Sequence, residues 1–264
     1  MSTSRLRCTA RGTVALCVLA LVAGVAIADI PEVVFEITAE ADQAGASHGA
    51  SFQILAEWGE YDREADVWTW TMPEPYEFWH NDTFLGSLDT FTATIVGDPE
   101  VNLSFSVQAG AANTAFHIGS ALLSDFDPIT DAIGYAHASY TLTDFDANSA
   151  ALTGVGDTGG AYLAQYNGWA GDPFGGPQGT TFAEGIFSMN AGFLETVTED
   201  FDHPESGYVD IEDTVYDMSS LVSFNLTAQD LASGTSNYVI VPEPATLALL
   251  ALGAIALRVG RRSA

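Results

Sequence analysis

The feature that most constrains the fold is a strict alternation of apolar and polar residues along the middle of the chain. In the segment VNLSFSVQ, residues 101–108, apolar side chains take every second position, and asparagine, serine and glutamine take the positions between them. The segments TFTATIV (90–96), VWTWTM (67–72) and LVSFNLTA (221–228) repeat the pattern. Successive side chains of a β-strand point to opposite faces, so this period predicts half-buried strands.

Turn-forming residues separate these segments. Glycine, aspartate, asparagine and proline lie between them, and no internal segment shows an extended helical period with caps. Many short strands joined by such turns are typical of an antiparallel β-sandwich or jelly roll. The sequence therefore predicts an all-β body that forms one domain over residues 29–240. It also predicts an N-terminal signal helix and a C-terminal hydrophobic helix on either side of that domain.

The distribution of charge divides the chain in the same way. The 264 residues include 35 acidic side chains and seven basic ones, all of them arginine. Every acidic residue lies between Asp29 and Glu243, where Arg63 is the only basic residue, so the middle of the chain carries 35 negative charges against one positive. A body this acidic repels phosphate backbones. Nucleic acid is therefore not expected as a partner.

The N-terminal segment has the features of an export signal. A stretch that contains arginine precedes an apolar run, and the run ends with Ala26 and Ala28 on either side of one isoleucine. This order predicts a secretory signal peptide over residues 1–28, cleaved after Ala28, and an uncleaved membrane anchor is the alternative. Cys8 and Cys17 both lie within this segment. The mature chain would then contain no disulfide.

The C-terminal segment combines a proline-rich motif, an apolar run and a basic end. The motif residues are Val241, Pro242, Glu243 and Pro244. Beyond the apolar run 245–257 lie the basic residues Arg258, Arg261 and Arg262. This combination resembles the PEP-CTERM sorting signal of exported bacterial proteins. The resemblance implies that residues 241–264 are a sorting and membrane-anchor segment, processed by a membrane protease called exosortase that recognises Glu243.

Elementary chemistry agrees with this resemblance. Pro242 and Pro244 keep the backbone extended before the apolar run, as a protease substrate requires. The apolar run is short compared with the roughly 20 residues that usually span a bilayer, and the arginines beyond it favour the cytoplasmic side. We therefore expect an exported protein that the C-terminal helix holds in the cell envelope before it reaches the cell surface or the extracellular matrix. A permanent, unprocessed tail anchor is the alternative.

The body gives a weaker resemblance, without an activity. It is similar to uncharacterised secreted β-rich proteins that carry the same tail. The segments that carry the likeness are FSVQAGAANTAFHIG and its continuation to YTLTD (105–144), GGAYLAQYNG (159–168) and LASGTSNYVIVPEP (231–244).

Alternating acids suggest a cation site. The tripeptide Asp-Phe-Asp occurs at 125–127, 144–146 and 200–202. The candidate calcium ligands are Asp125, Asp127, Asp144, Asp146 and Asn148, the last three at the 1, 3, 5 spacing of a calcium loop. An EF-hand is incomplete, because Ser149 replaces its glycine and Val155 its bidentate glutamate. The alternative is a solvated acidic turn with its phenylalanine in the core, and no other cofactor is expected.

The sequence contains none of the serine- or cysteine-hydrolase signatures that would assign it an activity. We therefore predict a non-enzymatic protein with a structural or adhesive role, for which extracellular polysaccharide is a candidate partner. One alternative is a carbohydrate-binding module or secreted glycosidase, and another is a calcium-stabilised adhesin. The aromatic residues that could stack on sugars are Trp58, Trp68, Trp70, Tyr76, Phe78 and Trp79. The two-residue spacing of Trp68 and Trp70 on one strand places both toward the core.

Overall fold

The structure, a computed structural model, describes residues 31–243 except 44, 98, 125, 157 and 170–177. This part of the chain forms seventeen strands and one short 3-10 helix, η1 (Ala56–Trp58). The predicted signal helix and C-terminal hydrophobic helix lie outside the described residues. Within them, no helix combines the length and the apolar character needed to cross a membrane.

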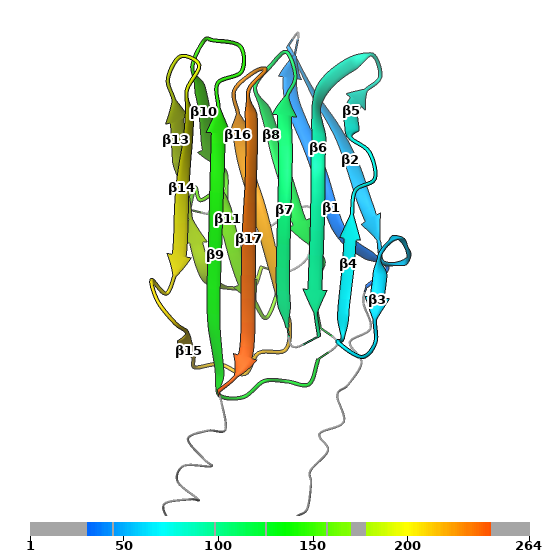
Figure 1. The fold of residues 1–264 in the computed structure, drawn as a ribbon, viewed down its shortest axis with the longest axis vertical. Coiled ribbons are helices and arrows are strands. Elements are labelled where there is room, and N and C mark those ends of the chain that lie inside the picture. The colour runs from blue at the N-terminus through cyan, green and yellow to red at the C-terminus, as the bar shows by residue number, and fades with distance from the viewer. Residues whose placement is uncertain are drawn as a thin grey trace, which may run out of the picture.

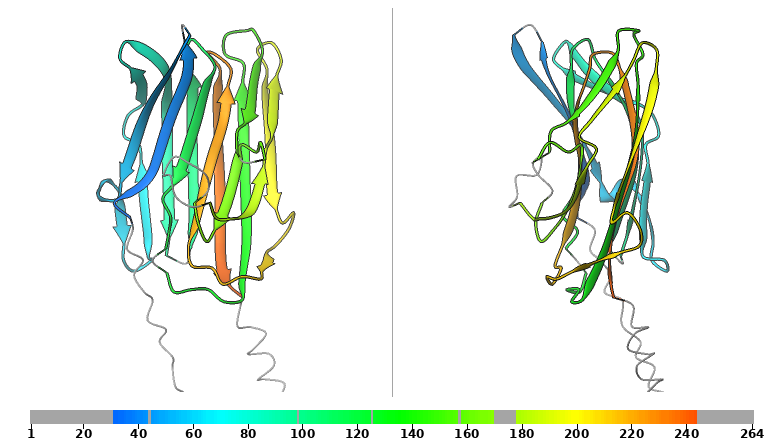
Figure 2. Two further views of the ribbon diagram at one scale, coloured as in Figure 1. Left: turned by 180° about the vertical axis from the view of Figure 1, so that it is seen from behind. Right: turned by 90° about the vertical axis from the view of Figure 1, so that its left-hand side faces the viewer.

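One sheet contains eight strands, and all of its pairings are antiparallel (Figures 1 and 2). Its strands are β1 (Val33–Gln43), β2 (Ala46–Leu55), β8 (Thr114–Ser120), β10 (Ala150–Gly154), β11 (Tyr162–Tyr166), β12 (Thr180–Gly185), β13 (Ser188–Ala191) and β16 (Met218–Leu226). The main order is β12-β11-β16-β8-β1-β2, and β10 pairs with both β13 and β16. Strand β2 therefore forms one edge.

The other sheet contains nine strands, also antiparallel. Its strands are β3 (Glu60–Asp62), β4 (Val67–Thr71), β5 (Tyr76–His80), β6 (Thr83–Val96), β7 (Glu100–Ala109), β9 (Ala132–Thr143), β14 (Thr196–His203), β15 (Val209–Ile211) and β17 (Leu231–Pro242). The main order is β14-β9-β17-β7-β6-β4-β3, while β15 pairs with β9 and β5 pairs with β6. The last described strand, β17, thus lies in the middle of its sheet.

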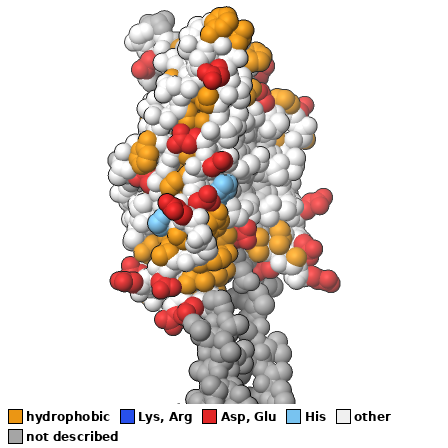
Figure 3. All heavy atoms as spheres, turned by 60° about the vertical axis from the view of Figure 1, so that its left-hand side comes forward, with side chains coloured by type: hydrophobic (Ala, Val, Ile, Leu, Met, Phe, Trp, Pro, Cys, Tyr) orange, Lys and Arg blue, Asp and Glu red, His pale blue; other side chains and the backbone are white. Residues whose placement is uncertain are grey.

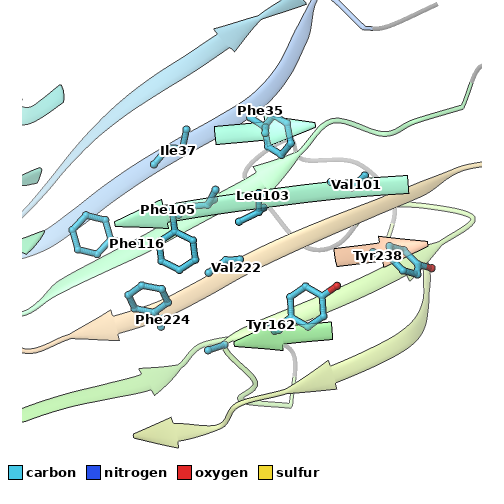
Figure 4. Packing of buried hydrophobic residues seen from close by; sticks show 14 of the residues in the cluster. Phe35, Ile37, Val101, Leu103, Phe105, Phe116, Tyr162, Val222, Phe224 and Tyr238 are labelled. Carbon is cyan, nitrogen blue, oxygen red and sulfur yellow. The ribbon is translucent and has the colours of Figure 1, made fainter. Parts of the chain in front are cut away.

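The two sheets pack face to face over one hydrophobic core (Figure 4). Phe105 of β7 stacks on Phe224 of β16 with ring centroids 6.0 Å apart, and Phe35 of β1 meets the edge of Phe91 of β6 at 5.5 Å. Both contacts join residues of different sheets. Burial of these large side chains provides the main driving force for bringing the sheets together.

The alternating segments form strands as predicted. In β7, Val101, Leu103, Phe105 and Val107 are buried, while the residues between them are half-buried or exposed. Trp68 and Trp70 of β4 both point into the core, as their spacing predicted. The prediction of an all-β body of antiparallel strands is confirmed.

Candidate functional site

The first two residues of the predicted sorting motif belong to the central strand β17. Val241 pairs with Ile133, and Pro242 pairs with Ala132. The next residue, Glu243, is exposed, and its backbone N–H donates to the carbonyl of Asp131 at 2.8 Å. The chain is therefore extended up to Glu243. No spacer separates the folded body from the start of the motif, and the predicted boundary after residue 240 falls inside a strand.

The other predicted sorting residues lie outside the described part of the chain. These are Ala26, Ala28, Pro244, Arg258, Arg261 and Arg262. Their predicted roles stay predictions.

At the opposite end of β17, three aspartates come together. Asp144 follows β9 directly, Asp146 lies in the turn after it, and Asp230 immediately precedes β17. Thr143 and Leu231 are paired neighbours, so the end of β9 and the start of β17 meet. One carboxylate oxygen from each aspartate lies within 4.8 Å of the other two. This is a separation that one cation could bridge.

Backbone donors hold the aspartates in this position. The N–H groups of Asn148 and Leu194 donate to the two carboxylate oxygens of Asp144, at 3.2 and 2.6 Å. Ala147 and Ser149 adopt left-handed backbone conformations, with φ of +67° and +80°, which turns the chain tightly around that carboxylate. The turn is thus built around Asp144.

Asp230 is anchored from the neighbouring segment. Phe145 donates its N–H to Asp230 Oδ1 at 3.2 Å, and the Thr227 hydroxyl donates to Asp230 Oδ2. Asp144 and Asp230 are both buried, whereas Asp146 is half-buried.

The environment shifts the pKa values of the two buried carboxyls, Asp144 and Asp230, in opposite directions. Burial tends to raise the pKa of Asp144, but four backbone N–H donors, that of Leu194 foremost, lower it below its ordinary value. Burial raises the pKa of Asp230, and the negative charges of Asp146 and Asp144 raise it further against the hydrogen bonds from Thr227 and Phe145. A cation bound between them would relieve this repulsion.

In the described part of the chain, no lysine or arginine lies near the three aspartates to neutralise their repulsion. Arg63 is the only lysine or arginine among the described residues, and it lies between β3 and β4. Those strands form the opposite edge of the sheet from β9 and β14. The face shown in Figure 3 carries scattered acidic side chains and no lysine or arginine. Three oxygen donors without a basic neighbour suit a hard cation such as Ca²⁺.

The structure brings together only part of the predicted calcium set. Asp144 and Asp146 join the cluster, while the Asn148 side-chain amide donates to Asp146 at 2.6 Å and so holds that carboxylate. Asp127 is exposed and lies outside the group, and Asp125 is not among the described residues. Nothing in the sequence indicates Asp230, because strands β10 to β16 separate it from Asp144 and no local spacing links the two residues.

The predicted aromatic set also divides. Trp68 and Phe78 are buried in the core, and Trp79 is exposed beside Glu77. Trp58, Tyr76 and Trp70, whose ring is also part of the core, line one pocket of about 450 Å³, together with Phe52, Met72, Pro73, Glu74 and Pro75. The pocket lies between an edge strand of one sheet and the β4–β5 connection of the other.

These features define a class of molecule. It has an acidic all-β body, and the central strand of that body ends in an extended proline motif. Residues 241–263 match the family described as the PEP-CTERM protein-sorting motif. The chain therefore carries this sorting motif, which implies an exported protein targeted to the membrane enzyme exosortase. A search of curated proteins finds no match.

Among solved structures, the VP2 subviral particle of infectious bursal disease virus gives a TM-score of 0.09 at 8% identity. The alignment covers 80% of this chain and 65% of the viral chain, which is less than two thirds of the latter. A likeness this low supports no argument about fold or function.

Proposed function

We propose that the chain is an exported β-sandwich protein that exosortase processes at residues 241–244. After processing it acts without catalysis, as a structural or adhesive component of the cell surface or extracellular matrix. The observation that carries this proposal is the continuity between β17 and the motif, since Val241 and Pro242 are paired within the sheet. A protease that grips the motif would act next to a folded, rigid body.

The charge of the body supports the proposed destination. Its acidic side chains repel anionic lipid surfaces, so cleavage would favour departure from the membrane. The same repulsion disfavours acidic polymers as partners and favours neutral polysaccharide or cations.

The test is a single substitution in the host. Glu243→Gln removes the charge that exosortase is expected to recognise, while the backbone bond from residue 243 to Asp131 can persist. We expect the variant to accumulate uncut in the membrane fraction and the extracellular matrix to lose the protein. Glu57→Gln, at another exposed acid, is the matched control and should be processed normally. Normal processing of Glu243→Gln, or an unchanged matrix in a deletion strain, would contradict the proposal.

A calcium-stabilised adhesin is a second candidate, favoured by the cluster of Asp144, Asp146 and Asp230. Phe145 and Phe193, which are 64% and 70% exposed, lie on the two turns that this cluster connects. A bound cation would fix these turns at the end of the body opposite the sorting motif, where an adhesive contact could form.

Thermal unfolding tests this candidate. After chelation, millimolar Ca²⁺ should raise the melting temperature, because a ligand that binds only the folded state stabilises it. Asp146→Asn should abolish the rise, whereas Asp200→Asn, in another copy of the same tripeptide, should retain it. An unchanged melting temperature for the unsubstituted protein would remove the candidate.

A further inference from the structure

The aromatic pocket at the edge of the molecule has features that the sorting function does not use. Phe52 comes from β2, Trp58 from η1 and Trp70 from β4, while the Met72–Pro75 connection and Tyr76 close the remaining side. These elements lie together on the right-hand side of Figure 1. The pocket volume of about 450 Å³ is in the range of small-molecule sites.

Three rings form a cup rather than a stack. The centroids of Phe52, Trp58 and Trp70 are separated by 6.0, 6.4 and 6.3 Å, and their planes are tilted by 36° to 41°. Tyr76 stacks on Phe52 at 4.4 Å, and Trp70 also packs on Phe91 of the core, with ring centroids 6.1 Å apart. Among the aromatic rings of the lining, only Trp58 is strongly exposed, at 46%, so it lies at the mouth of the pocket. A group placed over the centre would lie within the roughly 6 Å at which rings attract cations.

One carboxylate adds to that attraction. Glu74 is the only charged residue in the lining, and it lies between Pro73 and Pro75, whose rings restrict the backbone that carries it. The acidic body as a whole attracts cations and repels anions. The pocket is thus electrostatically selective for positive charge.

The remaining lining is poorly suited to a metal ion. Apart from Glu74, its side chains are aromatic, proline or methionine, so they supply few oxygen atoms to replace the hydration shell of a metal ion. The same scarcity of polar atoms leaves the hydroxyls of a sugar with few partners. An alkylated ammonium group carries positive charge and also gains from burying its methyl groups.

We propose that this pocket binds a quaternary ammonium group, held by the aromatic rings of Phe52, Trp58 and Trp70 and the charge of Glu74. The proposal does not depend on the sorting function. A soluble alkylammonium compound or the headgroup of a choline lipid could each present this group.

Calorimetric titration of the full chain with choline tests the proposal. We expect saturable binding, about tenfold or more tighter than that of the neutral isostere in which carbon replaces nitrogen. Trp58→Ala should weaken choline binding about tenfold, and Glu74→Gln should weaken it by a smaller factor that salt diminishes. Vesicles of phosphatidylcholine, with and without competing choline, distinguish a lipid headgroup from a free solute, and either result supports the chemistry.

The chain supplies matched controls. Trp79 is 49% exposed, and its indole N–H donates to Glu77 at 2.8 Å, so this pair repeats the residue types outside the pocket. Trp79→Ala and Glu77→Gln should leave choline binding unchanged. Absence of choline binding, equal affinity for the isostere, or equal losses in the control variants would overturn the proposal. So would binding of neutral oligosaccharides that Trp58→Ala abolishes while choline fails to compete, which would instead support the carbohydrate-binding alternative.

Discussion

The tripeptide Asp-Phe-Asp occupies two contrasting environments at residues 144–146 and 200–202. In β14, Phe201 points inward, where its ring meets that of Tyr162 at 6.3 Å, while both aspartates beside it are exposed. In the turn after β9 the arrangement is reversed, since Asp144 is buried and Phe145 is 64% exposed. The alternative interpretation, a solvated acidic turn with its phenylalanine in the core, is therefore wrong here about both side chains, although the turn itself is present.

The difference comes from the backbone rather than from the tripeptide. A strand alternates its side chains between the two faces, so one phenylalanine between two acids must point to the opposite side from them. The turn instead offers backbone N–H groups to Asp144, and these replace water around a buried carboxylate. The same tripeptide thus places its phenylalanine against the core in β14 and its aspartates in a candidate cation site in the turn after β9.

The largest difference in stability between the two regions should appear when Phe201 and Phe145 are each replaced by alanine. Phe201→Ala should destabilise the protein by about 2 to 3 kcal/mol, somewhat less than for a fully buried ring. A Cβ at Gly185 of the facing sheet would lie only 2.3 Å from the Phe201 ring, so the ring is closely packed there. Phe145→Ala should change stability by no more than about 0.5 kcal/mol. Denaturant unfolding measures both, and equal losses would contradict the contrast.

When a carboxylate is removed instead of a phenylalanine, the turn should lose more stability than the strand. Asp144→Asn replaces an acceptor of backbone hydrogen bonds with a group that carries its own N–H donors, so we expect a clear fall in melting temperature. Asp200→Asn, at an exposed strand position, should leave the melting temperature almost unchanged. A larger fall for Asp200→Asn would show that the turn does not depend on its buried acid.

The turn should also respond to pH through Asp230. Burial and the neighbouring acids raise its pKa, so the folded state binds more protons than the unfolded state above the ordinary aspartate value. Its contribution to stability is therefore lost as pH rises through the raised pKa. In calcium-free buffer, Asp230→Asn should flatten the decline in the denaturant midpoint as pH rises above the ordinary aspartate pKa of about 4. An identical pH profile for the variant would contradict this assignment.

The pH dependence of stability that comes from strand β14 should be the smallest of these effects, and its sign should be opposite to that of Asp230. Tyr135 donates to Asp202 at 2.5 Å and His137 contacts the same oxygen at 3.0 Å, and both lower the pKa of Asp202. Its contribution is present above the ordinary aspartate pKa and is lost as pH falls through the lowered value. The same hydrogen bond raises the pKa of Tyr135 to about 12.

Tyr135→Phe should therefore raise the pKa of the Asp202 carboxyl toward its ordinary value and reduce the loss of stability in acid. Carboxyl titration by NMR measures the first effect and acid unfolding the second. An unchanged Asp202 pKa would show that His137 alone accounts for the shift.

The sequence predicts the strands well because burial follows a local period. Val101, Leu103 and Phe105 alternate with polar residues, and this pattern alone predicts both the strand and its buried face. The sorting motif is equally local, since its parts are consecutive along the chain. Prediction from sequence is reliable where adjacent residues determine the outcome.

The clusters could be predicted only in part, because they depend on which strands become neighbours. Asp144 and Asp146 share a turn, but Asp230 joins them only because β17 pairs with β9. The cup likewise needs Phe52 from the edge of one sheet beside Trp70 of the other. Neither pairing leaves a spacing signal in the sequence.

The proposed function depends most on one event, the export of this protein with cleavage at its sorting motif. Its most direct test is the intact mass of the protein recovered from fractions of its own host. We predict a chain that begins near Asp29 and ends between residues 241 and 245, found outside the cells. A chain that still carries Arg261 and Arg262, found in the membrane fraction, would contradict processing and would make the tail a permanent anchor.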